Sequence, residues 1–205
     1  MNRILLYPEC QHYSLQELEK RLDFQYLSAN CYETPEDRVM IQEKGMDKLK
    51  SGGVMTESLE LGEKFARQIQ AGELPVVSVR FVNDQVGYGL FAEEEIVEGF
   101  FVGEYTGLVR ENNRRYFEPL NHYCYEYPVT DAMGRSFVID ATQGNLTRFI
   151  NHSFKPNLKP RYAFLDGFYH CIFIAQRTIA KGTQLTYDYG QSYWYVRSPP
   201  QPLQT

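Results

Sequence analysis

The spacing of apolar residues predicts helices in residues 1–73. Ser14 begins a capping box, Thr34 precedes a proline at a first helical position, and Thr56 is placed to cap a third helix. Gly52 and Gly72 follow the ends of the second and third apolar stripes. The stripes are narrow. They fit either a helical cap packed on the rest of the chain or an element for dimerisation or partner docking.

The pattern changes at Pro75 to short runs of β-branched and aromatic residues. Turn signals separate these runs, and Asp166-Gly167 predicts a tight hairpin. Residues 110–117 are at best a short polar helix, and residues 198–205 read as an extended tail. We therefore expect a mainly β domain over residues 75–197. Its predicted strands cover residues 76–82, 87–92, 100–105, 123–127, 137–140, 162–165 and 169–174.

Composition narrows the range of partners. The chain of 205 residues has a formal net charge of −5, with 43% hydrophobic and 15% aromatic residues. This favours a packed globular core and argues against a protein that coats nucleic acid. An acidic surface suits a basic partner such as a lysine-rich peptide.

The four cysteines lie far apart, without the spacing of zinc ligands, and predict no metal site. We interpret Cys10, Cys31, Cys124 and Cys171 as reduced, buried thiols of a reducing compartment. No apolar run is long enough for a secretory signal or a membrane span, and no basic cluster predicts nuclear import.

Gly87-Tyr88-Gly89-Leu90-Phe91-Ala92 matches the dinucleotide-binding pattern G-x-G-x-x-A. That pattern requires a helix N-terminus facing a pyrophosphate, but residues 93–95 are three glutamates, which would repel it. Two explanations remain: a tight glycine turn, or glycines that let the backbone approach a different ligand closely.

Two polar stretches on apolar anchors are the main candidates for chemistry: residues 144–153 and residues 185–190. Asn151 and His152 can offer amide and backbone groups to an adenine and an amino group. Each stretch alone has an ordinary explanation, since a single histidine is more often structural and the pair Tyr187 and Tyr189 is more often core.

Read together, these segments resemble the SET-domain lysine methyltransferases, which use S-adenosyl-L-methionine. The resemblance covers about residues 75–195. Within the family, the chain looks most like the short SET proteins of intracellular bacteria. The matching pieces occur in the family's order: Gly87 and Gly89, residues 103–107, Tyr123, residues 139–142, Gly144-Asn145, residues 148–153, Pro156-Asn157 and residues 185–190.

The resemblance implies a SET-type β-clip fold of small curved sheets, preceded by the helical region, in which the C-terminal segment threads a loop as a pseudoknot. This would bring Asn151-His152 beside residues 187–189. The implied catalytic residues are Tyr189, Tyr105 and Tyr187. The implied cofactor-binding residues are Gly87, Tyr88, Gly89, Tyr123, Arg148, Phe149, Asn151, His152, Tyr189 and Trp194.

The chemistry suits such a site. A lysine amine, with a free pKa of roughly 10.4, must lose one proton before it accepts a methyl group, and an aromatic channel beside a sulfonium disfavours the ammonium form. Tyrosine oxygens then orient the amine. The resemblance implies that Tyr187, two residues before the catalytic tyrosine, holds a water that limits the product to mono- or dimethylation.

The chain departs from the family pattern because neither flank carries zinc-binding cysteines. Aromatic residues after Gly190, chiefly Trp194, are expected to close the channel, although Trp194 can equally be a core anchor. We expect a histone or histone-like substrate and S-adenosyl-L-homocysteine as product. The alternatives are a catalytically silent interaction module and a methyltransferase of a non-histone protein. We also expect a homodimer through the helices. For location we expect a reducing compartment: either secretion into a host cell with action in its nucleus, or the cytoplasm.

Overall fold

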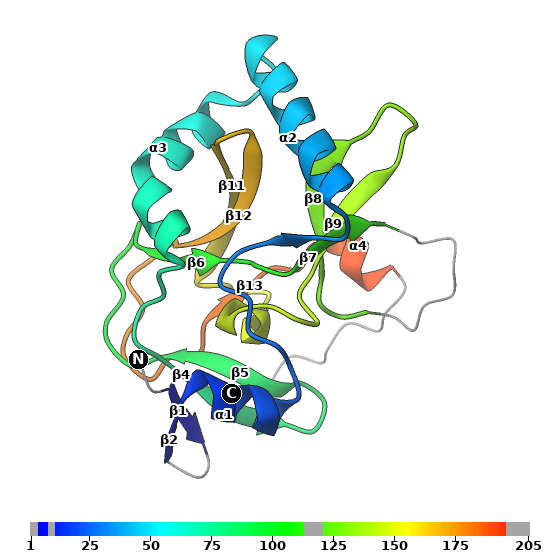
Figure 1. Ribbon diagram of the computed structural model, residues 1–205. Coiled ribbons are helices and arrows are strands. Elements are labelled where there is room, and N and C mark those ends of the chain that lie inside the picture. Colours follow the sequence, from blue (N-terminus) through cyan, green and yellow to red (C-terminus); the bar gives the residue numbers. More distant parts are fainter. Residues whose placement is uncertain (1–3, 8–10, 113–120, 196–205) are drawn as a thin grey trace.

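The computed structural model describes residues 4–7, 11–112 and 121–195, and it is mainly β with helices packed around small sheets (Figure 1). Within these residues the strands form four sheets. The first has the order β2-β1-β4-β5: Gln11–Tyr13, Ile4–Tyr7, Val77–Asn83 and Gly87–Ala92. The second has the order β3-β7-β9-β8: Cys31–Tyr32, Leu108–Glu111, Ser136–Asp140 and Cys124–Thr130.

The remaining strands build a three-stranded and a two-stranded sheet. The three-stranded sheet has the order β11-β12-β6: Leu158–Leu165, Phe168–Ala175 and Phe101–Glu104. The two-stranded sheet pairs β10, Asn151–His152, with β13, Thr186–Tyr187. The helices are α1 (Leu15–Leu22), α2 (Pro35–Lys50), α3 (Thr56–Ala71), the 3-10 helix η1 (Leu146–Phe149) and α4 (Gln191–Trp194).

The helix signals in the sequence are mostly confirmed. Ser14 forms the capping box of α1 and the side chain of Thr34 caps α2. Gly72 ends α3 with a left-handed backbone, at φ 59°. The prediction for Thr56 was wrong: it is the first helical residue, and the cap position is Met55, whose extended backbone begins the helix without a side-chain bond.

The expectation of an entirely helical region over residues 1–73 was incomplete. β1 pairs in parallel with β4, and β3 pairs in parallel with β7, so the sheets cross the boundary at Pro75. In β1, Ile4 and Leu6 are buried while Leu5 is less so, which is the alternation of a strand. The run is too short for that period to be recognised in the sequence. Arg110 and Glu111, assigned to a polar helix, belong to β7, and residues 113–120 of that segment lie outside the described part.

Glycines let α2 and α3 approach the hairpin of β11 and β12 closely. A Cβ on Gly62 would stand 1.9 Å from the carbonyl oxygen of Phe164, and a Cβ on Gly45 would stand 1.9 Å from that of Gly167. The predicted turn at Asp166-Gly167 is confirmed, with positive φ at both residues. The hairpin is therefore held directly against both helices.

The cysteines differ from the expectation of buried thiols. Cys171 is buried, Cys124 is partly exposed and Cys31 is exposed. Cys31 is exposed because β3 is a short strand at the edge of its sheet. Cys10 lies outside the described residues.

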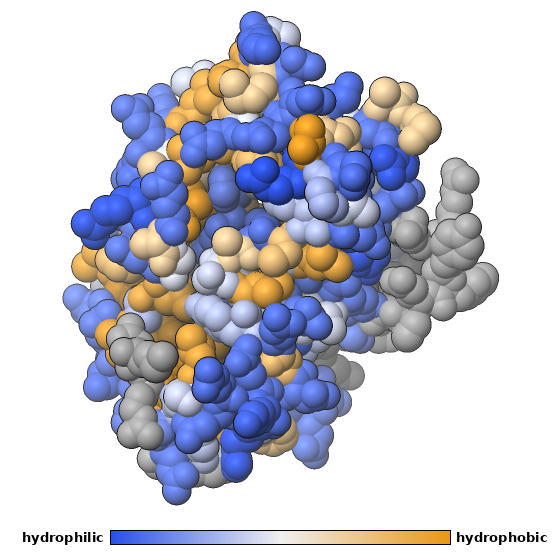
Figure 2. All heavy atoms as spheres, viewed as in Figure 1, coloured by the Kyte–Doolittle hydropathy of each residue, from blue (hydrophilic) through white to orange (hydrophobic). Residues whose placement is uncertain are grey.

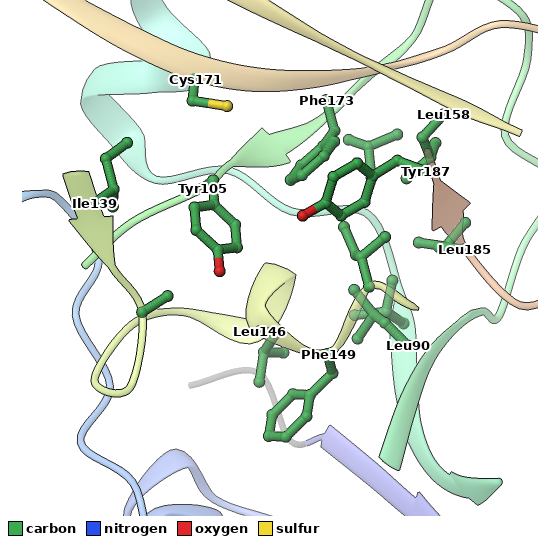
Figure 3. Close-up of a cluster of buried hydrophobic side chains, with 14 of the residues drawn as sticks. Leu90, Tyr105, Ile139, Leu146, Phe149, Leu158, Cys171, Phe173, Leu185 and Tyr187 are labelled. Atoms are coloured by element: carbon green, nitrogen blue, oxygen red, sulfur yellow. The ribbon is translucent and has the colours of Figure 1, made fainter. Parts of the chain in front are cut away.

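The main core joins the sheets around the aromatic residues and η1, and part of it is drawn in Figure 3. On the face in Figure 2, polar residues surround separate patches of apolar ones. The N-terminal helices expose Val39, Met55 and Leu59, so the predicted role of these helices in a dimer stays a prediction.

Candidate active site

Two segments far apart in the sequence meet through a pair of two-residue strands. β10 and β13 run in parallel, with Asn151 opposite Thr186 and His152 opposite Tyr187. The backbone N–H of Ser153 donates to the carbonyl oxygen of Tyr187 over 3.0 Å. The predicted meeting of Asn151-His152 with residues 187–189 is thereby confirmed.

The glycine turn of β5 lies against this pair. The Asn151 side-chain amide donates to the carbonyl oxygen of Tyr88 over 3.1 Å. A Cβ on Gly89 would stand 2.5 Å from Gln184 Nε2 and 3.1 Å from Asn151 Nδ2, whereas Gly87, at φ 73°, has open space around it. Gly89 is therefore required for close packing, and Gly87 is free to face a ligand.

His152 holds the backbone of Tyr189. Its Nδ1 accepts from the backbone N–H of Tyr189 over 3.2 Å and lies 3.6 Å from a carboxylate oxygen of Asp188. The ring contacts Phe154 and Trp194, at centroid distances of 4.5 and 4.9 Å. Burial lowers the pKa of His152, although Asp188 opposes this shift. The imidazole is thus neutral, with its proton on Nε2.

Arg148 is a buried cation among aromatic rings. Its guanidinium lies 4.1 Å from the ring centroid of Tyr123, and Nε donates to the carbonyl oxygen of Ala141 over 2.8 Å. Burial lowers the pKa of Arg148 from its usual value, but the group stays charged. The neighbouring Phe149 is buried and meets the Tyr88 ring at 6.5 Å.

The tyrosines form one cluster. The Tyr187 ring lies 4.6 Å from Tyr189 and 6.3 Å from Tyr125, and Tyr125 lies 5.7 Å from Tyr105. Figure 3 shows the hydroxyl of Tyr187 directed toward Tyr105. The Tyr189 hydroxyl donates to the carbonyl oxygen of Ile150, and that of Tyr105 donates to the carbonyl oxygen of Tyr123.

Burial raises the pKa of Tyr105, Tyr187 and Tyr189 above the usual tyrosine value. All three hydroxyls are therefore neutral near pH 7, and none serves as a tyrosinate base. Neutral hydroxyls of this kind can orient an amine by hydrogen bonding.

Helix α4 closes one side of the cluster with aromatic rings. Trp194 stacks on Tyr189 with an interplanar angle of 12°, and the Tyr193 hydroxyl lies 3.0 Å from His122 Nδ1. Trp194 therefore packs on both His152 and Tyr189, while its role in the site stays a prediction. Within the described residues no group of three or more His, Cys, Asp or Glu side chains could hold a metal ion. In the same part of the chain, no helix is both long and apolar enough to cross a membrane.

The polar groups near the cluster that lack protein partners fit S-adenosyl-L-methionine. Among the described residues, His152 Nε2 and Trp194 Nε1 are buried without a hydrogen-bond partner, and Arg148 forms no ion pair with a carboxylate, since the nearby Asp140 is paired with Arg110. Buried donors without partners are costly, and adenine nitrogens and a carboxylate are acceptors of the right kind. The predicted cofactor residues lie in this region, while their individual roles stay predictions.

Two neighbours were missed from the sequence. Tyr125 lies between Tyr105 and Tyr187, and the alternation of Tyr123, Tyr125 and Tyr127 along the predicted strand 123–127 was a signal for it. Phe24, in the loop after α1, packs on Phe149 at 5.5 Å, and no motif marks it.

Comparisons with known proteins agree with this geometry. The family model described as SET domain matches residues 87–190, half of the chain. The chain is 38% identical over 109 residues to a histone-lysine N-methyltransferase, trithorax, of Drosophila virilis, covering 50% of this chain and 3% of that protein. It is also 38% identical over 109 residues to the putative histone-lysine N-methyltransferase ASHH4 of Arabidopsis thaliana, covering 52% of this chain and 31% of that protein.

A solved structure of ATXR5 in complex with mono-methylated histone H3.1 has the same fold. It covers 85% of this chain and 85% of its own, with a TM-score of 0.63 and 24% identity. The expected mainly β fold of this type is confirmed, and the similarity includes much of the region before residue 87. The chain spans less than a third of the two curated relatives.

Proposed function

The chain belongs to the SET-domain family, whose methyltransferases use S-adenosylmethionine, and we propose that it is a protein-lysine N-methyltransferase. The observation that carries the proposal is the neutral tyrosine cluster held against the pairing of β10 with β13. We further propose that the substrate is a histone or histone-like protein. Relatives named as histone-lysine methyltransferases and the acidic net charge of −5 support this.

The residues present would hold the cofactor in a definite way. Gly87 leaves space for close approach, while His152 and Trp194 carry buried donors for its acceptor atoms. Arg148 offers its guanidinium to a carboxylate. When bound, S-adenosyl-L-methionine supplies a methyl group on a positively charged sulfur.

The tyrosines act on the amine. Because the Tyr189 hydroxyl donates its hydrogen to the Ile150 carbonyl, its remaining lone pairs can accept from a lysine N–H. Tyr105, fixed on the Tyr123 carbonyl, acts in the same way. The lysine proton is lost to solvent, since an aromatic channel disfavours the ammonium form. We propose mono- or dimethylation, with Tyr187 restricting the space.

Two alternatives and several finer proposals remain open. The chain can be a catalytically silent module that works through its N-terminal helices, or it can methylate a non-histone protein. A zinc-free site, a homodimer through the helices and the role of a bacterial effector secreted into a host cell stay predictions from the sequence.

The test is incubation with labelled S-adenosyl-L-methionine and mixed histones or lysate, read by mass spectrometry. We expect label on lysine, and Tyr189→Phe should lower turnover by about 100-fold or more, since a positioned hydrogen-bonding group that acts on the reacting centre contributes at this scale. Calorimetry with S-adenosyl-L-homocysteine should give nearly the same affinity for both proteins. Cofactor binding without turnover on any substrate would favour the silent module.

A further inference from the structure

Three aromatic rings enclose the Arg148 guanidinium. Its central carbon lies 4.1 Å from the Tyr123 ring centroid and 5.0 Å from each of the Phe24 and Phe149 centroids. Cation–π contacts are strongest where water is excluded, and Arg148 is only 9% exposed. Phe24 is the member of this group that lies outside the matched residues 87–190.

The guanidinium has charge left to satisfy. Nε donates to the Ala141 carbonyl, and among the described residues no carboxylate forms an ion pair with Arg148; Asp140, which is paired with Arg110, attracts it only from a longer distance. A buried guanidinium gains most from a ligand carboxylate, which it can bind with two parallel N–H groups. Such binding requires that the plane of the guanidinium be fixed in advance.

The chain holds Phe24 rigidly. Asp23, at φ 51°, ends α1 in a left-handed turn, and the N–H of Phe24 donates to the Glu19 carbonyl. Immediately after it, Gln25 and Leu27 exchange backbone hydrogen bonds with Gly144, of 3.0 and 3.2 Å. The loop is thereby fixed to the start of the segment that carries Arg148.

We propose that Phe24 is a positioning residue of the cofactor site: it fixes the face of the Arg148 guanidinium so that the terminal N–H groups meet the carboxylate of the methionine part. This inference rests on the proposed function. It makes the loop after α1 part of the cofactor site, although that loop carries none of the motifs of the family.

The experiment compares two probes on the full chain by calorimetry. S-adenosyl-L-homocysteine has the carboxylate, whereas 5′-methylthioadenosine has the adenosine part without it. Phe24→Leu keeps an apolar side chain but removes the ring, and it should weaken S-adenosyl-L-homocysteine binding by about 3- to 10-fold, the scale of a desolvated cation–π contact. Binding of 5′-methylthioadenosine should change by less than about 2-fold, and Phe24→Tyr should restore the affinity of wild type.

A control variant and a double variant distinguish a positioning role of Phe24 from a general effect on the stability of the fold. Leu18→Ala, in α1, removes a fully buried side chain, so it should lower the melting temperature without changing either affinity. In an Arg148→Lys background, Phe24→Leu should have no further effect on S-adenosyl-L-homocysteine binding, because the two residues act together.

Each result decides between the proposals. An unchanged affinity for S-adenosyl-L-homocysteine, or an equal loss for both probes, overturns the role of Phe24 and leaves the proposed function intact. If the wild-type chain binds neither probe, the proposed function fails and the inference fails with it.

Discussion

At the scale of single residues, Tyr187 differs from its neighbours in how its hydroxyl is bonded. The hydroxyls of Tyr105, Tyr162 and Tyr189 donate to backbone carbonyl oxygens. In the part of the chain that the structure describes, the Tyr187 hydroxyl has no such partner, although the side chain is only 7% exposed. A hydroxyl without a protein partner, on a side chain that is otherwise largely buried, is suited to hold a water molecule.

Tyr187→Phe should therefore raise the degree of methylation. Removing the hydroxyl removes the anchor for the water, and the space gained accommodates a methylated amine. We expect the share of the highest methylation state to rise several-fold in mass spectra of the product, with total turnover within about 3-fold of wild type, the loss of one neutral hydrogen bond. Tyr195→Phe, at an 82% exposed position, is the control. Trimethylation as the main wild-type product would contradict this role.

His152 makes the stability of the folded protein depend on pH. Burial lowers its pKa in the folded protein below the 6.5 of a free histidine, so the unfolded chain binds more protons between these two values. The contribution of neutral His152 to the free energy of unfolding is therefore fully present above pH 6.5. It is lost as the pH falls through the pKa that His152 has in the folded protein. Protonation also removes the acceptor for the Tyr189 N–H.

The check is urea unfolding at several values of pH from 7.5 to 5. In His152→Gln, which has no titrating group, the free energy of unfolding should fall less steeply with acid than in wild type. His12→Gln, at an exposed position, should retain the wild-type slope. Equal slopes for wild type and His152→Gln would refute the prediction.

At the scale of elements, the contact between α3 and β11 depends on the absence of one methyl group. Gly62→Ala increases helix propensity by about 1 kcal/mol, yet the new Cβ would collide with the Phe164 carbonyl at 1.9 Å. Since backbone on both sides must move, we expect a net loss of about 1–3 kcal/mol in the free energy of unfolding, measured with urea.

Gly53→Ala provides a matched comparison for this prediction. Its Cβ would meet the flexible Lys48 side chain at 3.0 Å, which can shift at low cost. The free energy of unfolding should change by less than about 0.5 kcal/mol, as at other surface positions. A stabilised Gly62→Ala protein would show that α3 is not packed as closely as described.

Local signals predicted elements where the chemistry of the turn or cap is local. The capping box at Ser14 and the hairpin at Asp166-Gly167 depend on neighbouring residues, so the sequence was sufficient. β1, β10 and β13 form because partners far along the chain supply their hydrogen bonds. Runs of two to four residues carry too little periodicity to reveal such pairing.

At the scale of the molecule, the N-terminal region and the rest of the chain share one core. β1 lies inside its sheet between β2 and β4, and Leu6, Leu18 and Ile41 are fully buried. Removing residues 1–73 should leave a chain that lacks a cooperative thermal transition and shows poor dispersion in NMR spectra, because exposed apolar surface and lost strand pairing both oppose folding. A truncated chain that binds S-adenosyl-L-homocysteine normally would refute this.

The residues of the site could be predicted from the sequence where they belong to motifs of the family. Asn151, His152, Tyr187 and Tyr189 were placed together from their order in the sequence, and the structure brings them together. Phe24 could not be found in this way, because its contact with Arg148 depends on how a loop outside the motifs is anchored to Gly144.

The pairing of β10 with β13 also sets an order in time. The hairpin of β11 and β12 lies between these two strands in the sequence, so the ribosome completes it before Thr186 and Tyr187 have been made. A nascent chain at that stage has most of its sheets but lacks the strand that aligns His152 with Tyr189. The capacity to bind a cofactor therefore arises late in synthesis, after most of the chain that surrounds the site has been made.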